Sequence, residues 1–414
     1  MNLEKEQAKS FKTLWRNHDY LLLWIGESIS DLGTGISQVA FPVLVLILTN
    51  SPATAGLIFS VGQLPYILFG LLAGALVDYW DRKRIMLFCA AGLALCLAGV
   101  ALVVLSGLSI SIQIASFFVF SFLIGTLTVF YGLAALATLT QVVPKHQLPR
   151  ALSQNEAAYS TISLTAPPIG TFLLSIGRLL PFVVDSISYL VLFLSIFFMR
   201  TSFQEERKDR KVSLLKDIRT GLHWVWQQHV VRFLIVLAGY LDVMVRINVL
   251  LVPVIAHNAG LPLRLVGIIL AAAGLGNILS VVVSPLLQRR FAMGKVLIST
   301  LMLLALLWPV YALATNPWSL GAIIASLACV DSIAYQHIIN YRLSVVPDQL
   351  QGRVGSIARL ILFGCTTIGP AVVGICLQRI GIVPTIGGVW AGFIFFMFLA
   401  IFNRQLRQAA LSRR

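Results

Sequence analysis

Apolar residues in this chain fall into long uninterrupted runs, most of them 20 to 30 residues long. A helix of about 20 apolar residues crosses a hydrocarbon core about 30 Å thick. Lipid offers no hydrogen-bond partners, so spanning segments must be helices or closed barrels, and barrel strands would alternate between apolar and polar residues. The runs show no such alternation, and they predict an all-α membrane protein with twelve transmembrane helices. Their approximate limits are 20–48, 52–77, 84–107, 111–141, 152–177, 180–200, 231–256, 262–288, 294–314, 317–345, 354–379 and 382–403.

One long polar stretch, which contains the run EERKDRK at 205–211, divides the spans six and six. We therefore expect an N-terminal six-helix bundle at 1–200, a cytoplasmic linker at 201–230 and a C-terminal six-helix bundle at 231–414. Within the linker, residues 213–228 have the apolar spacing of an amphipathic helix, which predicts a helix on the membrane surface.

The two halves repeat each other at fixed offsets, which indicates a duplicated six-helix unit. At an offset of about 211 residues, Asp31 matches Asp242 and Pro42 matches Pro253; at about 203, Pro144 matches Pro347, Arg150 matches Arg353 and Pro167 matches Pro370. Parallel repeats of this kind let two similar bundles rock about a site at their interface, and they are the architecture of the major facilitator fold. The prediction is therefore two pseudo-symmetric six-helix bundles.

Composition and charge agree with a membrane protein: 58% of the residues are hydrophobic, only 11% are charged, and the net charge is +15. All but five of the 31 Lys and Arg residues lie in termini and loops on one predicted side. The exceptions are Arg178, Arg264 and Arg379 on the other side, and Arg246 and Arg359 within helices. By the positive-inside rule, this bias places both termini in the cytoplasm and explains the charge without a nucleic-acid partner.

The loop after the second span reads GALVDYWDRKR from Gly74 to Arg84. It resembles the signature loop of the major facilitator superfamily, in which a glycine, a helix-ending aspartate and a basic cluster recur. The resemblance implies that the glycine allows close helix packing and that the charges form a gating latch against the neighbouring bundle. The latch residues would be Gly74, Asp78, Arg82, Lys83, Arg84 and Arg353.

Other segments resemble the bacterial drug:proton antiporter group that includes macrolide and enterobactin exporters. They are LWRN at 14–17, VVDSISY at 183–189, DIRTGLHWVW at 217–226 and GRVGS at 352–356. The resemblance implies efflux from the bacterial inner membrane, driven by proton entry.

Two spans carry proline next to small residues: Pro167 with Gly170 in the fifth, and Gly369 with Pro370 in the eleventh. These resemble the glycine-proline motif of antiporters, which implies helix bends. Proline and small residues also serve ordinary helix packing, and that interpretation stays open.

A charge at the bilayer centre costs about 2.5 to 3.5 kcal/mol, so those that persist usually face a water-filled path. Glu27 and Asp31 lie one turn apart on the first span, which the resemblance places on the central cavity. Burial in apolar surroundings disfavours the ionised form of a carboxyl group, as a proton-coupling site needs. We expect Glu27, Asp31, Asp242 and Asp331 to couple protons; structural carboxylates satisfied by Ser or Thr are the alternative for the first pair.

Polar residues near these carboxyl groups are candidates for the substrate cavity: Arg246, Gln336, His337 and Asn340. Arg246 could instead form a stabilising ion pair with Asp242 four residues earlier. His337 could shuttle protons or pack between helices. Asp185, in the sixth span, is expected to be structural because the resemblance makes that helix peripheral.

No GxxxxGK, HExxH or GxSxG motif occurs, so we expect neither an enzyme nor a cofactor or metal. The favoured function is proton-coupled efflux of a small amphipathic compound such as a drug, macrolide or siderophore, by a monomer. An uptake symporter or facilitator, and a non-transporting receptor or assembly factor, are the alternatives.

Overall fold

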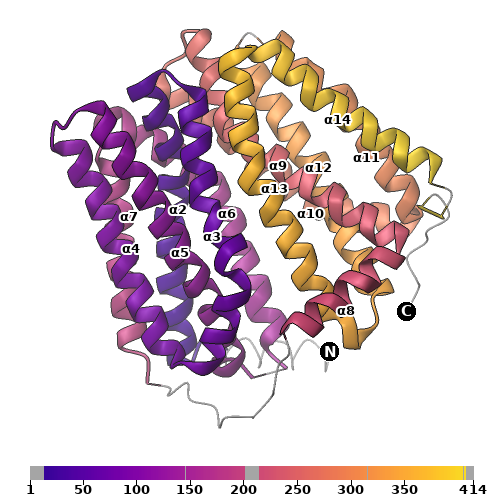
Figure 1. The fold of residues 1–414 in the computed structure, drawn as a ribbon, viewed down its shortest axis with the longest axis horizontal. Helices are drawn as coiled ribbons and strands as arrows, with labels where there is room; N and C mark the ends of the chain where they lie inside the picture. The colour runs from indigo at the N-terminus through magenta and orange to yellow at the C-terminus, as the bar shows by residue number, and fades with distance from the viewer. Residues whose placement is uncertain (1–13, 145, 201–213, 315, 404, 407–414) are drawn as a thin grey trace. The chain divides into compact units, whose positions relative to one another are not determined.

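The computed structural model describes residues 14–144, 146–200, 214–314, 316–403 and 405–406 (Figure 1). Its regular elements are all helices. By their contacts the residues divide into two units: 1–49 with 61–208, and 50–60 with 209–414.

The first unit contains six long helices. They are α2 (His18–Thr49), α3 (Pro52–Tyr79), α4 (Arg82–Leu105), α5 (Ile110–Val142), α6 (Leu148–Ile176) and α7 (Leu180–Phe197). Helix α2 packs against α6 and α7, and α4 packs against α5 and α7. Helix α3 is divided, because its first residues, up to Ser60, belong by their contacts to the second unit.

The second unit contains one short helix and six long ones. They are α8 (Leu214–Gln227), α9 (His229–Asn258), α10 (Leu263–Arg290), α11 (Met293–Leu307), α12 (Pro317–Val345), α13 (Gln351–Arg379) and α14 (Ile382–Phe402). Helix α9 packs against α13, α10 against α12, and α11 against α12 and α14. Helix α11 gives way at Trp308–Leu313 to a 3-10 turn, where Pro309 removes a backbone donor.

Eleven helices in the described part of the chain are long and apolar enough to cross a membrane. The predicted span at 152–177 is the exception: it forms the 29-residue helix α6 but does not meet that standard. Its first turns carry polar residues such as Gln154, Asn155 and Glu156. The six-and-six arrangement of long helices is nevertheless the one expected from the sequence.

Close helix contacts occur where glycine removes the side chain. A Cβ on Gly125 of α5 would collide with the carbonyl oxygen of Gly62 in α3, and one on Gly276 of α10 would collide with that of Ala325 in α12. Small residues at such points let membrane helices pack through their backbones.

The predicted linker helix is present as α8, while residues 201–213 of the linker, with the EERKDRK run, lie outside the described residues. Val225 of α8 is buried in an apolar cluster with residues of α9 and α13. Leu222 and Trp226 are exposed instead. A position of α8 on the membrane surface stays a prediction.

Candidate functional site

Glu27 and Asp31 lie one turn apart on α2, as the sequence predicts, and interact electrostatically with each other. The Tyr131 hydroxyl of α5 donates a hydrogen bond to Glu27 Oε1 at 3.3 Å. Glu27 is half-buried and Asp31 is exposed. Among the described residues, no Lys, Arg or His forms an ion pair with either carboxyl group.

A second polar group lies beside this pair, where α7 meets α2. Asp185 is only 2% exposed, and the Ser188 hydroxyl donates to its Oδ1 at 3.2 Å. Tyr189 exchanges a hydrogen bond of 2.8 Å with Thr34 of α2 and interacts electrostatically with both Asp31 and Asp185. Tyr189 therefore connects the exposed carboxyl group of α2 with the buried one of α7.

Glycine at position 33 makes this contact possible. A Cβ there would lie 2.7 Å from Asp185 Oδ1 and nearer still to the Ser188 hydroxyl. Asp185 is thus held directly against the backbone of α2 at Gly33, two residues from Asp31. We expected Asp185 to be structural. The sequence did not reveal that it lies beside the pair Glu27 and Asp31.

The second unit has its own group of charges. Asp242 and Arg246 form an ion pair on α9, with Arg246 Nε 3.2 Å from Asp242 Oδ2. Asp331 of α12 is 9% exposed and interacts electrostatically with Asp242. Its Oδ1 atom is buried without a hydrogen-bond partner in the described part of the chain. Tyr335, one turn further along α12, interacts electrostatically with all three.

The other predicted cavity residues on α12 have different surroundings. Gln336 is half-buried and makes a long contact of 3.5 Å to Ser280 of α10. His337 is fully buried, and its Nδ1 bonds the Ile333 carbonyl at 2.8 Å, which requires Nδ1 to carry the proton. Asn340 is exposed. His337 therefore does not border open space in this conformation, whereas Asn340 does.

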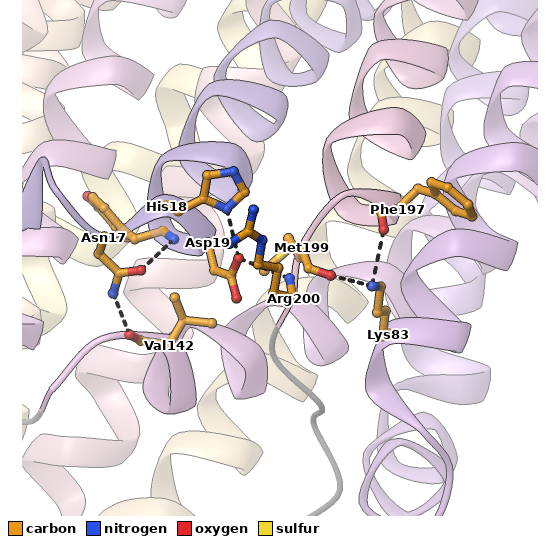
Figure 2. Close-up of polar contacts among 9 residues, drawn as sticks. Asn17, His18, Asp19, Lys83, Val142, Phe197, Met199 and Arg200 are labelled. Carbon is orange, nitrogen blue, oxygen red and sulfur yellow. Dashed lines mark hydrogen bonds and ion pairs between the residues drawn. The ribbon is translucent and has the colours of Figure 1, made fainter.

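The expected latch residues lie near the end of α3 and at the starts of α4 and α13. The ammonium group of Lys83 donates to the carbonyls of Phe197, at 3.2 Å, and Met199, at 2.6 Å, so it caps the end of α7 (Figure 2). Asp81 caps the start of α4, and Arg84 makes only an exposed 3.7 Å pair with it. Lys83 is thus bound inside its own unit.

The remaining latch residues lie on three helices: Gly74 and Asp78 on α3, Arg82 on α4 and Arg353 on α13. Arg82 is half-buried, and Arg353 is exposed beside Gly221 of α8. A Cβ on Gly74 would meet no described heavy atom within 4 Å, so the expected close packing is not seen there. The side chain of Asp78 lies outside the described residues.

The first unit is fastened at the same end by a network around the start of α2 (Figure 2). Asn17 donates to the Val142 carbonyl at 2.9 Å, which ties α2 to the end of α5. The buried Asp19 carboxylate accepts a bond of 3.0 Å from the backbone N–H of Arg200, the residue before the linker.

Both proline-containing segments continue as helices, and their glycines lie at close contacts. A Cβ on Gly170 of α6 would lie 2.7 Å from the Ile36 carbonyl of α2, and one on Gly369 of α13 would collide with Val243 of α9. Pro167 and Pro370 are both buried. The two glycines thus lie at close helix contacts, and a bend at the prolines stays a prediction.

Comparisons with known proteins place the chain in a family. Multidrug efflux pump Tap of Mycolicibacterium fortuitum is 23% identical over 405 residues, covering 95% of this chain and 98% of the pump. Macrolide efflux protein A of Streptococcus pyogenes is 25% identical over 236 residues, covering 56% of this chain and 57% of that protein. A bacterial homologue of the iron transporter ferroportin, solved in an inward-facing state, has a similar fold, with a TM-score of 0.74 at 14% identity over 94% of this chain and 98% of that one.

The family profile covers nearly the whole chain, residues 10–411. The family and these relatives are transporters rather than enzymes, and the bacterial relatives imply the inner membrane. The chain therefore belongs to the transmembrane secretion effector family of major facilitator transporters.

Proposed function

We propose that this transporter exports a small amphipathic organic compound, such as a drug, macrolide or siderophore, in exchange for protons that enter the cell. The observation that carries the proposal is the pair Glu27 and Asp31, two interacting carboxyl groups on a membrane helix that no described cation neutralises. Efflux pumps among the relatives support the direction of transport.

Unpaired carboxyl groups can couple transport to protons for a physical reason. In an apolar site the ionised form is costly, whereas contact with water stabilises it. A site that opens alternately to the two sides of the membrane would therefore take up a proton on one side and release it on the other.

In this cycle, Glu27 and Asp31 exchange protons in the first unit, and Asp242 and Asp331 do so in the second. Arg246 competes with protons for the carboxylate of Asp242. A proton that binds Asp242 would free Arg246, and a charged substrate that binds one of the two residues would free the other. Gln336, Asn340 and, in another conformation, His337 would contact the substrate. Asp78, Arg82, Arg84 and Arg353 would form the latch, with both termini in the cytoplasm and the protein a monomer.

Transport into everted membrane vesicles tests this proposal. A screen of macrolides, other antibiotics and siderophores in cells that lack or overproduce the protein identifies an exported compound. Vesicles acidified inside should then accumulate that compound, and Asp31→Asn should reduce accumulation to the level of vesicles without the protein. Asp209→Asn, the same chemical change in the polar linker, should leave accumulation intact.

The proposal fails if Glu27→Gln, Asp31→Asn and Asp242→Asn all retain proton-driven accumulation. It also fails if intact producing cells take the compound up rather than lose it.

A further inference from the structure

A cavity of about 200 Å³ lies within the second unit, among α9, α12 and α13. Most of its wall is aliphatic and buried: Val231, Leu234 and Ile235 come from α9, and Ile338 and Ala358 come from α12 and α13. The polar lining consists of Tyr335, Arg342 and Arg359. The cavity is therefore apolar apart from two positive charges and a phenol.

The two arginines lack a counter-ion within the described structure. Arg342 and Arg359 interact electrostatically with each other, and Arg342 also interacts with Tyr335. No described carboxylate forms an ion pair with either guanidinium group. Two adjacent like charges beside apolar walls repel each other, and a bound anion would relieve that repulsion.

We propose that this cavity binds the head of an amphipathic organic anion. The guanidinium groups of Arg342 and Arg359 match the geometry of a phosphate or carboxylate, to which arginine donates paired hydrogen bonds. The aliphatic wall takes the first carbons of the attached chain. The residues that would bind the anion, Arg342 and Arg359, are distinct from the proton-coupling carboxyl groups.

Its size limits what it can enclose. At about 30 Å³ for a water-sized group, 200 Å³ holds roughly six or seven such groups. Sites that enclose drug-sized ligands usually measure about 300 to 1,000 Å³. The cavity therefore fits a charged head and a few methylene groups, with the rest of the ligand outside.

Tyr335 places the site next to the carboxyl groups of this unit. It interacts electrostatically with Arg342 and Arg246, and with Asp242 and Asp331. An anion bound at Arg342 would thus share Tyr335 as a neighbour with the Asp242–Arg246 pair.

Binding of radiolabelled octyl phosphate to purified protein, in detergent or in phosphatidylcholine nanodiscs, tests the proposal. We expect saturable binding that unlabelled octyl phosphate displaces and octanol does not. The double variant Arg342→Gln/Arg359→Gln should weaken binding at least about tenfold, because it removes the charged hydrogen-bond donors to the anion. Arg289→Gln/Arg290→Gln, which removes two exposed arginines at the end of α10, is the matched control and should bind as the wild type does.

A second variant removes the space and keeps the charges. A Cβ on Gly355, which lines the cavity, has no described heavy atom within 4 Å, so Gly355→Leu can fill the cavity without a backbone clash. It should also abolish binding while the protein elutes as a folded species. Unchanged binding in either variant, or equal displacement by octanol, would overturn the proposal.

The lipid composition of the nanodiscs distinguishes two natural sources of the anion. Nanodiscs that contain phosphatidylglycerol should weaken the apparent affinity for octyl phosphate if anionic lipid heads occupy the site. An unchanged affinity assigns the site to a soluble amphipathic anion.

Discussion

Replacing Gly33 by alanine should disturb the buried contact between α2 and α7. The new Cβ would lie 2.7 Å from Asp185 Oδ1 and closer still to the Ser188 hydroxyl, and 2.8 Å from Ser188 Cβ. Overpacking of this kind usually costs about 1 to 3 kcal/mol. The gain in helix propensity from glycine to alanine returns about 0.5 to 1 kcal/mol, so we expect a net loss of about 0.5 to 2 kcal/mol.

Gly132→Ala is the matched control, because Gly132 is exposed in α5 and a Cβ there meets no described atom within 4 Å. That variant should be as stable as the wild type or slightly more so, since it gains propensity without a clash. The difference between the two variants should be about 1 to 3 kcal/mol, or roughly 2 to 4 °C of melting temperature per kcal/mol for a unit of this size.

Thermal unfolding of both purified variants in one detergent, followed by tryptophan fluorescence, measures this difference. We also expect Ser188→Gly to lessen the effect of Gly33→Ala. It removes the Oγ and Cβ atoms of Ser188, which are two of the three atoms nearest to the new Cβ. Equal melting temperatures for Gly33→Ala and Gly132→Ala would refute the direct contact between Asp185 and the α2 backbone.

Three further predictions concern orientation, the end of α7 and the Glu27 carboxyl group. A fluorescent protein fused to the C-terminus should fluoresce, and alkaline phosphatase fused there should be inactive. Fusions in the loop at residues 106–109 should give the opposite results. The reverse pattern would contradict the assigned orientation. Lys83→Met should lower stability by about 1 to 2 kcal/mol, because the carbonyls of Phe197 and Met199 at the end of α7 lose a charged donor. Arg84→Met, at an 88% exposed side chain, should cost less than about 0.5 kcal/mol in the same melting assay. Tyr131→Phe, which removes only the hydroxyl bonded to Glu27, should slow transport and change stability by no more than about 1 kcal/mol, whereas Tyr159→Phe at an exposed position should change neither; unaffected transport in Tyr131→Phe would separate this hydroxyl from the mechanism.

Helix positions were predictable from the sequence because charged residues and turns end each apolar run. The run at 111–141 became helix 110–142, and the run at 317–345 was correct to the residue. The less regular elements also have local causes: Pro309 follows the end of α11, and the polar residues of α6 keep it below the hydropathy of the other spans. The aspartates at 31 and 242 were visible as a repeat because the two halves of the sequence match at a fixed offset.

The partners of individual side chains were not predictable, because they depend on how each helix is rotated against its neighbours. Asp185 was assigned to a peripheral helix, yet α7 turns it onto Gly33 of α2. Small residues at Gly33, Ser37 and Ser188 were the available signal, since such stripes mark close helix contacts. Likewise, nothing in the sequence shows that Lys83 binds the end of α7.

Tyr131 and Tyr335 were overlooked as partners of carboxyl groups. Each is a hydroxyl-bearing ring in an apolar segment, and a buried Tyr usually finds a partner for its hydroxyl group. The hydroxyl of Tyr131 donates to Glu27. A search for isolated polar atoms within each span would have found both.

Proton movement by the purified protein in liposomes tests the central claim most directly. With the exported compound on one side and a pH-sensitive dye trapped inside, addition of the compound should start a proton flux opposite in direction to its transport. That flux should disappear in Asp31→Asn and persist in Asp209→Asn. Compound transport without any proton flux, or an undiminished flux in Asp31→Asn, would contradict the account.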